Sequence, residues 1–87
     1  MKYEHEPNFL PTIAWHAGPP PGIGWWPAST MGDYNALRWW DGKHWSRVAY
    51  PDMSARQAAA RAAVRAHSPM PIRWAYPGMH KNWRYPQ

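Results

Sequence analysis

The clearest pattern of apolar and polar positions lies at residues 37–50, LRWWDGKHWSRVAY, where aromatic and branched side chains flank a polar Asp-Gly pair. An Asp-Gly pair in this setting is a strong signal for the turn of a β-hairpin. A two-residue turn would place Trp40 opposite Lys43, whereas a four-residue loop places Trp40 opposite Trp45. We favour the four-residue loop because it sorts the side chains between two distinct faces.

The two faces of the predicted hairpin carry different kinds of side chain. The first face consists of Leu37, Trp39, Ser46 and Val48, with Leu37 opposite Val48. The second face consists of Arg38, Trp40, Trp45 and Arg47. We therefore expect Trp39 in the core. A Trp40–Trp45 pair, contributing up to about 1 kcal/mol, is expected on the face that carries the two arginines.

A helix is predicted over about residues 53–67, within the stretch PDMSARQAAARAAVRAH. Ser54 followed by Gln57 matches a capping box, alanine dominates the interior, and Pro69 prevents continuation. At about 100° per residue, six alanines share one face of this helix. That face gains little by burial alone, but it permits a close approach to large aromatic side chains of the sheet.

Proline-rich segments surround these elements. Residues 22–28, GIGWWPA, are predicted to form a short strand that ends at Pro27, and residues 72–76 could add another. Residues 1–21 and 68–87 are expected to be extended arms, because their prolines bar helix locally. The whole pattern predicts an α+β fold in a single small domain, residues 1–87. A small antiparallel β-sheet and one Ala/Arg-rich helix occupy residues 22–67 of this domain.

Composition changes the expected core of this domain. The chain of 87 residues has no cysteine, so neither disulfides nor thiolate metal sites can support so small a fold. Branched aliphatic residues are scarce, whereas there are 8 Trp, 5 Tyr and 1 Phe. Each buried aromatic side chain removes roughly 150–250 Å² from water. We therefore expect a core of Trp, Tyr, Met and Ala.

The charge of the chain points to a negatively charged partner. The formal net charge is +5 and the isoelectric point is near 10.0. Nucleic acid, an acidic protein face and anionic lipid all fit such a balance. No apolar run approaches the roughly 20 residues of a membrane span, so no membrane association is expected. The absence of cysteine fits a reducing cytoplasm.

The polar residues carry no recognisable catalytic pattern. The five histidines lack zinc-site spacing, and the aspartates are explained as turn or helix-start residues. A pair between His44 and Asp41 could form in the hairpin loop. The serines lie in no nucleophile-elbow context, and residues 18–24, GPPPGIG, do not match a phosphate loop. We therefore expect a protein that is not an enzyme and that needs no cofactor or metal.

The remaining signal is a surface of tryptophan and arginine. Its candidate binding residues are Arg38, Trp40, Trp45 and Arg47 of the hairpin together with Arg56, Arg61 and Arg65 of the helix. Arginines can stack over tryptophans simply for stability. The same residues can form a stacking platform for single-stranded nucleic acid. They also dominate the hot spots of protein–protein interfaces.

Part of this pattern resembles known small proteins. The matching stretches are Gly24-Trp25-Trp26-Pro27, Leu37-Arg38-Trp39-Trp40-Asp41-Gly42 and Trp45-Ser46. They resemble bacterial domains of unknown function with Gly-Trp-Tyr-Pro followed by Trp-Asp-Gly-x-x-Trp-Thr, and small bacteriophage orphan proteins with an Ala-Leu-Arg-Trp-Trp-Asp-Gly core. The first resemblance implies a small β-module that serves as a scaffold. The second implies a small phage protein that binds host proteins, including defence complexes.

Two functional hypotheses follow from these observations. The first is a non-enzymatic, phage-encoded protein-binding module in the host cytoplasm. It would modulate or inhibit a host protein or defence complex, for example a CRISPR-Cas effector. The second is a basic nucleic-acid-binding protein that uses tryptophan stacking and arginine contacts. A virion or assembly component is a third, minor alternative.

Overall fold

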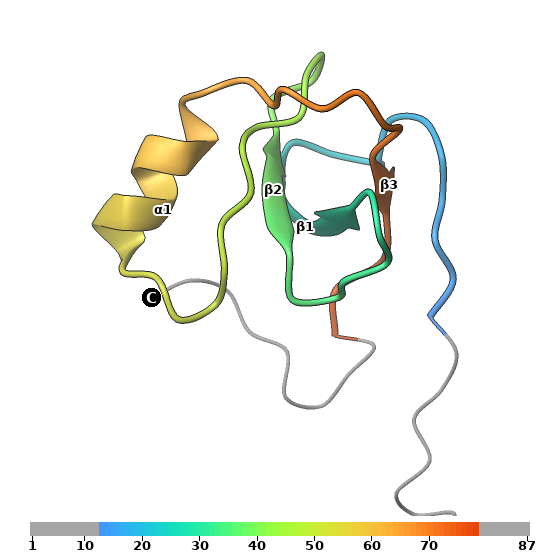
Figure 1. Cartoon of the computed structure of the whole chain (residues 1–87), viewed down its shortest axis with the longest axis horizontal. Coiled ribbons are helices and arrows are strands. Elements are labelled where there is room, and N and C mark those ends of the chain that lie inside the picture. Colours follow the sequence, from blue (N-terminus) through green and yellow to red (C-terminus); the bar gives the residue numbers. More distant parts are fainter. Residues whose placement is uncertain (1–12, 79–87) are drawn as a thin grey trace, which may run out of the picture.

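The computed structural model describes residues 13–78, which form a three-stranded antiparallel sheet with one short helix beside it (Figure 1). The elements are β1 (Gly24–Ser29), β2 (Leu37–Trp40), α1 (Ala55–Ala62) and β3 (Arg73–Trp74). The strand order is β2-β1-β3, so β1 is central. This arrangement confirms the small α+β fold with an antiparallel sheet. The expectations for residues 1–12 and 79–87 lie outside the described residues.

Pro27 lies inside the central strand, although the sequence predicts that this strand ends there. On the side of β2, Pro27 lies opposite Leu37. The N–H and C=O of Leu37 are both hydrogen-bonded to Ala49, so Leu37 needs no N–H from Pro27. On the side of β3, the Pro27 carbonyl accepts from Ala75 N at 2.9 Å. Because proline has no N–H, the sheet lacks one hydrogen bond on the side of β3, at the point where β3 ends. The strand continues to Ser29 for this reason.

Single rungs extend the sheet on both sides of its three strands. His16 pairs with Trp74 beyond β3. Beyond β2, residues 45–49 return antiparallel, with Trp40 opposite Trp45 and Leu37 opposite Ala49. Ser46 in turn pairs with Arg65. Segments that are far apart in the sequence are thereby joined edge to edge.

The hairpin has the predicted four-residue loop but a shifted second half. Trp40 lies opposite Trp45 as predicted, whereas Leu37 lies opposite Ala49 and not Val48. The one-residue difference is a β-bulge, with Ser46 filling it: Trp39 N donates to Ser46 Oγ at 2.8 Å. The bulge reverses the alternation beyond it, so the predicted faces of Val48 and Arg47 are wrong.

The helix is shorter than predicted, ending at Ala62 instead of about residue 67. Its start is as expected, because Ser54 and Gln57 form the full capping box. After the C-cap residue, Ala63, the chain becomes extended and pairs with the hairpin: Arg47 N donates to the Val64 carbonyl at 2.8 Å. Sheet hydrogen bonds thus replace the last predicted turn of helix. Arg65 is consequently not a helical neighbour of Arg61.

Small side chains dominate the buried core. It contains Leu37, Trp74, Tyr34 and a set of alanines: Ala28, Ala36, Ala49, Ala58 and Ala75. The core was expected to contain methionine, but of the methionines within residues 13–78, Met31 and Met70 are exposed and Met53 is half-buried. Trp74 contacts the rings of His16, Trp26 and Tyr76 at centroid distances of 4.6, 5.3 and 5.0 Å. Aromatic contacts therefore surround this small core.

The alanine face of α1 is turned toward the sheet tryptophans, but the predicted close packing against them is wrong, because an open groove separates the two. Trp25 and Trp39 pack edge to face at 5.5 Å and line a groove of about 400 Å³ with five helix-face alanines. The groove is open, and Trp39 is half-buried where the sequence predicts a core position. Only Ala58 of α1 is buried. In the described part of the chain, no helix has the length and apolar character needed to cross a membrane.

Candidate functional site

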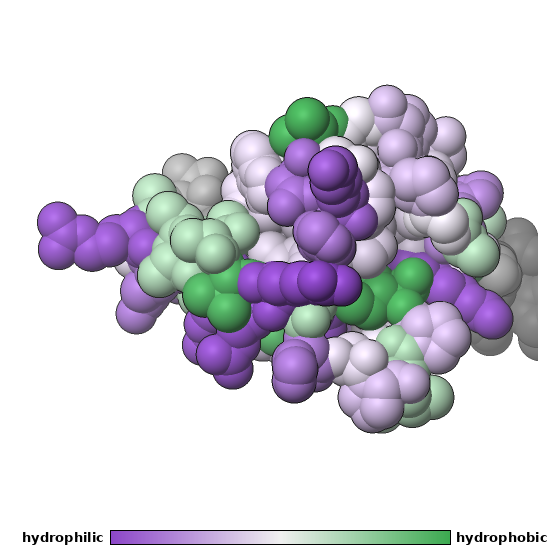
Figure 2. All heavy atoms as spheres, turned by 90° about the horizontal axis from the view of Figure 1, so that it is seen from above, coloured by the Kyte–Doolittle hydropathy of each residue, from purple (hydrophilic) through white to green (hydrophobic). Residues whose placement is uncertain are grey.

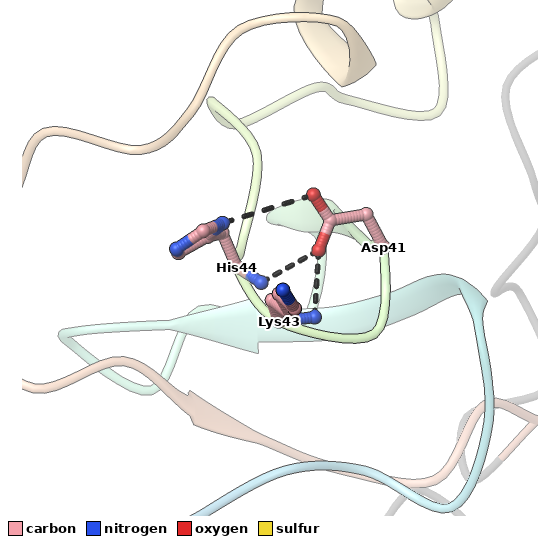
Figure 3. Close-up of polar contacts among 3 residues, drawn as sticks. All are labelled: Asp41, Lys43 and His44. Atoms are coloured by element: carbon pink, nitrogen blue, oxygen red, sulfur yellow. Dashed lines mark hydrogen bonds and ion pairs between the residues drawn. The ribbon is translucent and has the colours of Figure 1, made fainter.

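The Asp-Gly pair organises the tip of the hairpin (Figure 3). One carboxylate oxygen of Asp41 accepts hydrogen bonds from the main-chain N–H groups of Lys43 at 2.7 Å and His44 at 2.6 Å. These two bonds hold the pKa of Asp41 below its usual value of 3.8, and the bond from His44 N–H has the larger effect. Gly42 has φ of 101°, which glycine adopts without strain. Asp41 and Gly42 therefore act as turn residues.

The other carboxylate oxygen of Asp41 lies 4.0 Å from the His44 ring nitrogen Nδ1. The expected pair between these two residues is therefore present, at the limit of an ion-pair distance. Asp41 and His44 are both well exposed to solvent. Water weakens such a pair.

Trp40 and Trp45 face one another across the base of this loop. Their ring centroids are 4.9 Å apart, and the ring planes are inclined by 58°. Main-chain bonds hold the pair from both sides, from Asp41 N to the His44 carbonyl at 3.2 Å and from Ser46 N to the Trp39 carbonyl at 2.9 Å. Both tryptophans are half-buried. The two indoles thus form a fixed, angled surface that is still open to solvent.

The rung between Ser46 and Arg65 brings the chain after α1 to the tryptophan pair. Ala66 N donates to the Trp45 carbonyl at 2.7 Å. Arg65 and Ala66 consequently border an open depression of about 380 Å³ beside the two indoles. The complete lining is Gly18, Pro19, Trp40, Lys43, His44, Trp45, Arg65, Ala66, Ser68 and Ile72. We call this depression the Trp40–Trp45 pocket.

The charged groups of the Trp40–Trp45 pocket are all basic. Lys43 and Arg65 line it together with His44, and no carboxylate is part of the lining. Within residues 13–78, neither Lys43 nor Arg65 is within ion-pair distance of a carboxylate. Strongly hydrophilic side chains gather at the middle of this end of the molecule, with isolated hydrophobic ones between them (Figure 2). The lining therefore carries cationic side chains and no acidic one, and the carboxylate of Asp41 lies beside His44 at the hairpin tip.

Arg38 lies on the strand beside Trp40 but is held inward. Its Nη1 donates to the Ser46 carbonyl at 3.0 Å, and its Nε is buried with no acceptor among the described residues. Burial lowers the pKa of this guanidinium below its usual value, although arginine remains charged in proteins. Arg38 thus ties β2 to the returning strand and contributes less to the open surface than predicted.

The other predicted arginines are dispersed. Arg61 donates to the Val48 carbonyl at 2.8 Å and thereby fastens the end of α1 to the hairpin. Arg47 and Arg56 are exposed, and neither lines the Trp40–Trp45 pocket. Of the seven predicted binding residues, the structure gathers Trp40, Trp45 and Arg65 in one pocket.

Sequence reasoning did not identify Lys43 and His44 as part of the site. Their position between Trp40 and Trp45 was a usable signal, because a four-residue loop puts them next to both rings. Nothing in the sequence indicated that Gly18, Pro19 and Ile72 would line the pocket. These residues are brought in by the sheet rungs and by the course of the chain around the sheet.

The chemistry of the Trp40–Trp45 pocket is that of non-covalent contacts. Among the described residues, no three His, Asp or Glu side chains lie close enough to hold a metal ion together. What the pocket offers is angled aromatic surface, cationic groups and main-chain polar atoms. Comparison with protein-family models, curated proteins and solved structures finds no match for this chain.

Proposed function

We propose that this chain is a non-enzymatic binding module that uses the Trp40–Trp45 pocket to occupy an acidic surface on a partner protein. The proposed partner is a host protein or defence complex, such as a CRISPR-Cas effector, which the module modulates or inhibits. The observation that carries the proposal is the convergence of two half-exposed indoles with Lys43 and Arg65 in one depression. Within residues 13–78, neither cation has an ion-pair partner.

Interface energetics explain why this convergence supports protein binding. Tryptophan and arginine are enriched among residues whose truncation costs 2 kcal/mol or more, roughly a 30-fold loss of affinity. The Trp40–Trp45 pair is already ordered by the hairpin, so little conformational entropy is lost on binding. Lys43 and Arg65 add an attraction for acidic surfaces that raises the association rate.

A pull-down of the tagged full chain from nuclease-treated bacterial lysate tests the proposal. We expect one protein or complex to be retained. Trp40→Ala and Arg65→Ala should each reduce the retained amount at least about tenfold, because they remove groups that line the pocket. Arg56→Ala is the matched control for Arg65→Ala, because it removes the same charge from a side chain that is exposed but does not line the pocket.

Two results would contradict this proposal. One is equal retention by all three folded variants, which would place the binding surface elsewhere. The other is the loss of every retained protein on nuclease treatment. Circular dichroism on each variant separates a binding defect from unfolding.

Binding of single-stranded nucleic acid is the second candidate function. It is favoured by the same unpaired cations beside solvent-accessible indoles, because bases stack on aromatic rings for roughly 1–3 kcal/mol each. Affinity for a labelled dodecathymidine should then fall steeply with salt, in proportion to the phosphates neutralised. An absence of submicromolar binding at low salt would eliminate this candidate.

A further inference from the structure

The segment after α1 forms a free outer edge of the extended sheet. The rung between Ser46 and Arg65 is held by bonds from their neighbours, Arg47 N to Val64 O at 2.8 Å and Ala66 N to Trp45 O at 2.7 Å. In an antiparallel ladder, a residue in such a pair directs its own N–H and C=O to the opposite side. No strand among residues 13–78 pairs with that side of Arg65.

This free edge borders the Trp40–Trp45 pocket. Ala66, which follows Arg65 along this edge, lines the pocket and donates its N–H to the Trp45 carbonyl at 2.7 Å. Arg65 itself is exposed and lines the pocket. Lys43 and His44, in the hairpin loop, line the same pocket. One extended ligand can therefore contact the edge, the indoles and the cations together.

We infer that this edge and pocket bind an extended acidic segment of the partner, a refinement that rests on the proposed function. The segment pairs its main chain with the N–H and C=O of Arg65, as in strand addition to a sheet edge. One aromatic or bulky aliphatic side chain enters the angle between Trp40 and Trp45. Neighbouring Asp or Glu side chains meet Lys43 and Arg65, which have no carboxylate partner in the described part of the chain.

Two features favour a peptide over a nucleic acid strand at this place. A nucleic acid backbone has no alternating N–H and C=O groups to satisfy the edge at Arg65. The tryptophan rings also cover part of each other, since their centroids are 4.9 Å apart and their planes are inclined by 58°. That angled pair suits an inserted side chain better than a base, which stacks on an open ring face.

Selection of random dodecapeptides on the immobilised full chain tests the inference. We expect enriched peptides to contain Asp and Glu around one aromatic or bulky aliphatic residue. Arg65→Glu should weaken the selected peptides at least about tenfold, whereas Arg56→Glu, with the same charge change outside the pocket, should leave affinity within about twofold.

A second pair of variants isolates the main-chain contact. Arg65→Ala removes the guanidinium, and Arg65→Pro removes both the guanidinium and the outward N–H, which proline tolerates at a sheet edge. We expect the Pro variant to bind the selected peptide about 3–10-fold more weakly than the Ala variant, the range of one hydrogen bond. N-methylation of the central peptide residues should cause a similar loss.

The outcomes separate this inference from the proposed function. Failure to enrich peptides, enrichment without acidic residues, or equal binding by Arg65→Ala and Arg65→Pro overturns the extended-segment inference. If the lysate partner is still lost on Arg65→Ala, the proposed function stands and the partner presents a folded surface. Salt-dependent dodecathymidine binding that Arg65→Glu abolishes would instead assign the pocket to nucleic acid and overturn the inference.

Discussion

At the scale of single residues, Ser46 has a structural role that its residue type alone does not reveal. Its hydroxyl accepts from Trp39 N at 2.8 Å and donates to the Arg47 carbonyl at 2.8 Å, inside the bulge of the hairpin. Ser46 is only 3% exposed. We expect Ser46→Ala to lower the free energy of unfolding by about 1–3 kcal/mol, because a buried N–H loses its acceptor.

Urea denaturation followed by tryptophan fluorescence measures this loss. Ser68→Ala is the control, since Ser68 makes its hydrogen bonds to Met70 in an exposed segment and should change stability by less than about 0.5 kcal/mol. Equal losses in the two variants would contradict the role assigned to Ser46.

Asp41 makes the hairpin tip sensitive to acid. Because its pKa is lowered in the folded chain, its contribution to stability is complete above the unfolded value and is lost as pH falls through the folded value. On acidification from pH about 5 to about 2, we expect the melting temperature of Asp41→Asn to fall less than that of the unsubstituted chain. The asparagine keeps an oxygen for the two N–H groups but does not titrate. An unchanged acid profile in the variant would show that Asp41 makes no such contribution.

At the scale of elements, local signals predicted starts and turns better than ends. The four-residue loop and the capping box depend on residues within a few positions of one another, and both were predictable. The end of α1, the bulge at Ser46 and the passage of β1 through Pro27 depend on partners far away in the sequence. Propensity favoured a longer helix, but hydrogen bonds to the hairpin stabilise residues 64–66 as an extended edge.

The capping box gives a test at this scale. Ser54 Oγ accepts from Gln57 N at 3.1 Å, and Gln57 Oε1 accepts from Ser54 N at 3.0 Å. Ser54→Ala should cost about 1 kcal/mol of stability, whereas Ser54→Thr, which retains the hydroxyl, should cost less. Far-ultraviolet circular dichroism during denaturation follows this change. Equal effects of Ala and Thr would mean that the cap does not stabilise α1.

At the scale of the whole molecule, the site results from connections between distant segments. The sequence predicted that Lys43 and His44 lie in a loop, and the register of the hairpin predicted the Trp40–Trp45 pair. Arg65 reaches that pair only because the helix ends early and its continuation joins the sheet. The predicted helix would have kept Arg65 beside Arg61. The tryptophan pair was therefore predictable from the sequence, whereas most of the residues gathered around it were not.

Site-specific photo-crosslinking tests the central claim most directly. A photo-reactive benzoylphenylalanine is placed at position 43 in the Trp40–Trp45 pocket, or at position 56 on exposed α1, and each full chain is irradiated in nuclease-treated lysate. We predict a covalent adduct with a single protein from position 43 and none from position 56. Adducts from position 56 alone, or none from position 43 while the chain still retains its partner, would contradict the assignment of this pocket as the binding surface.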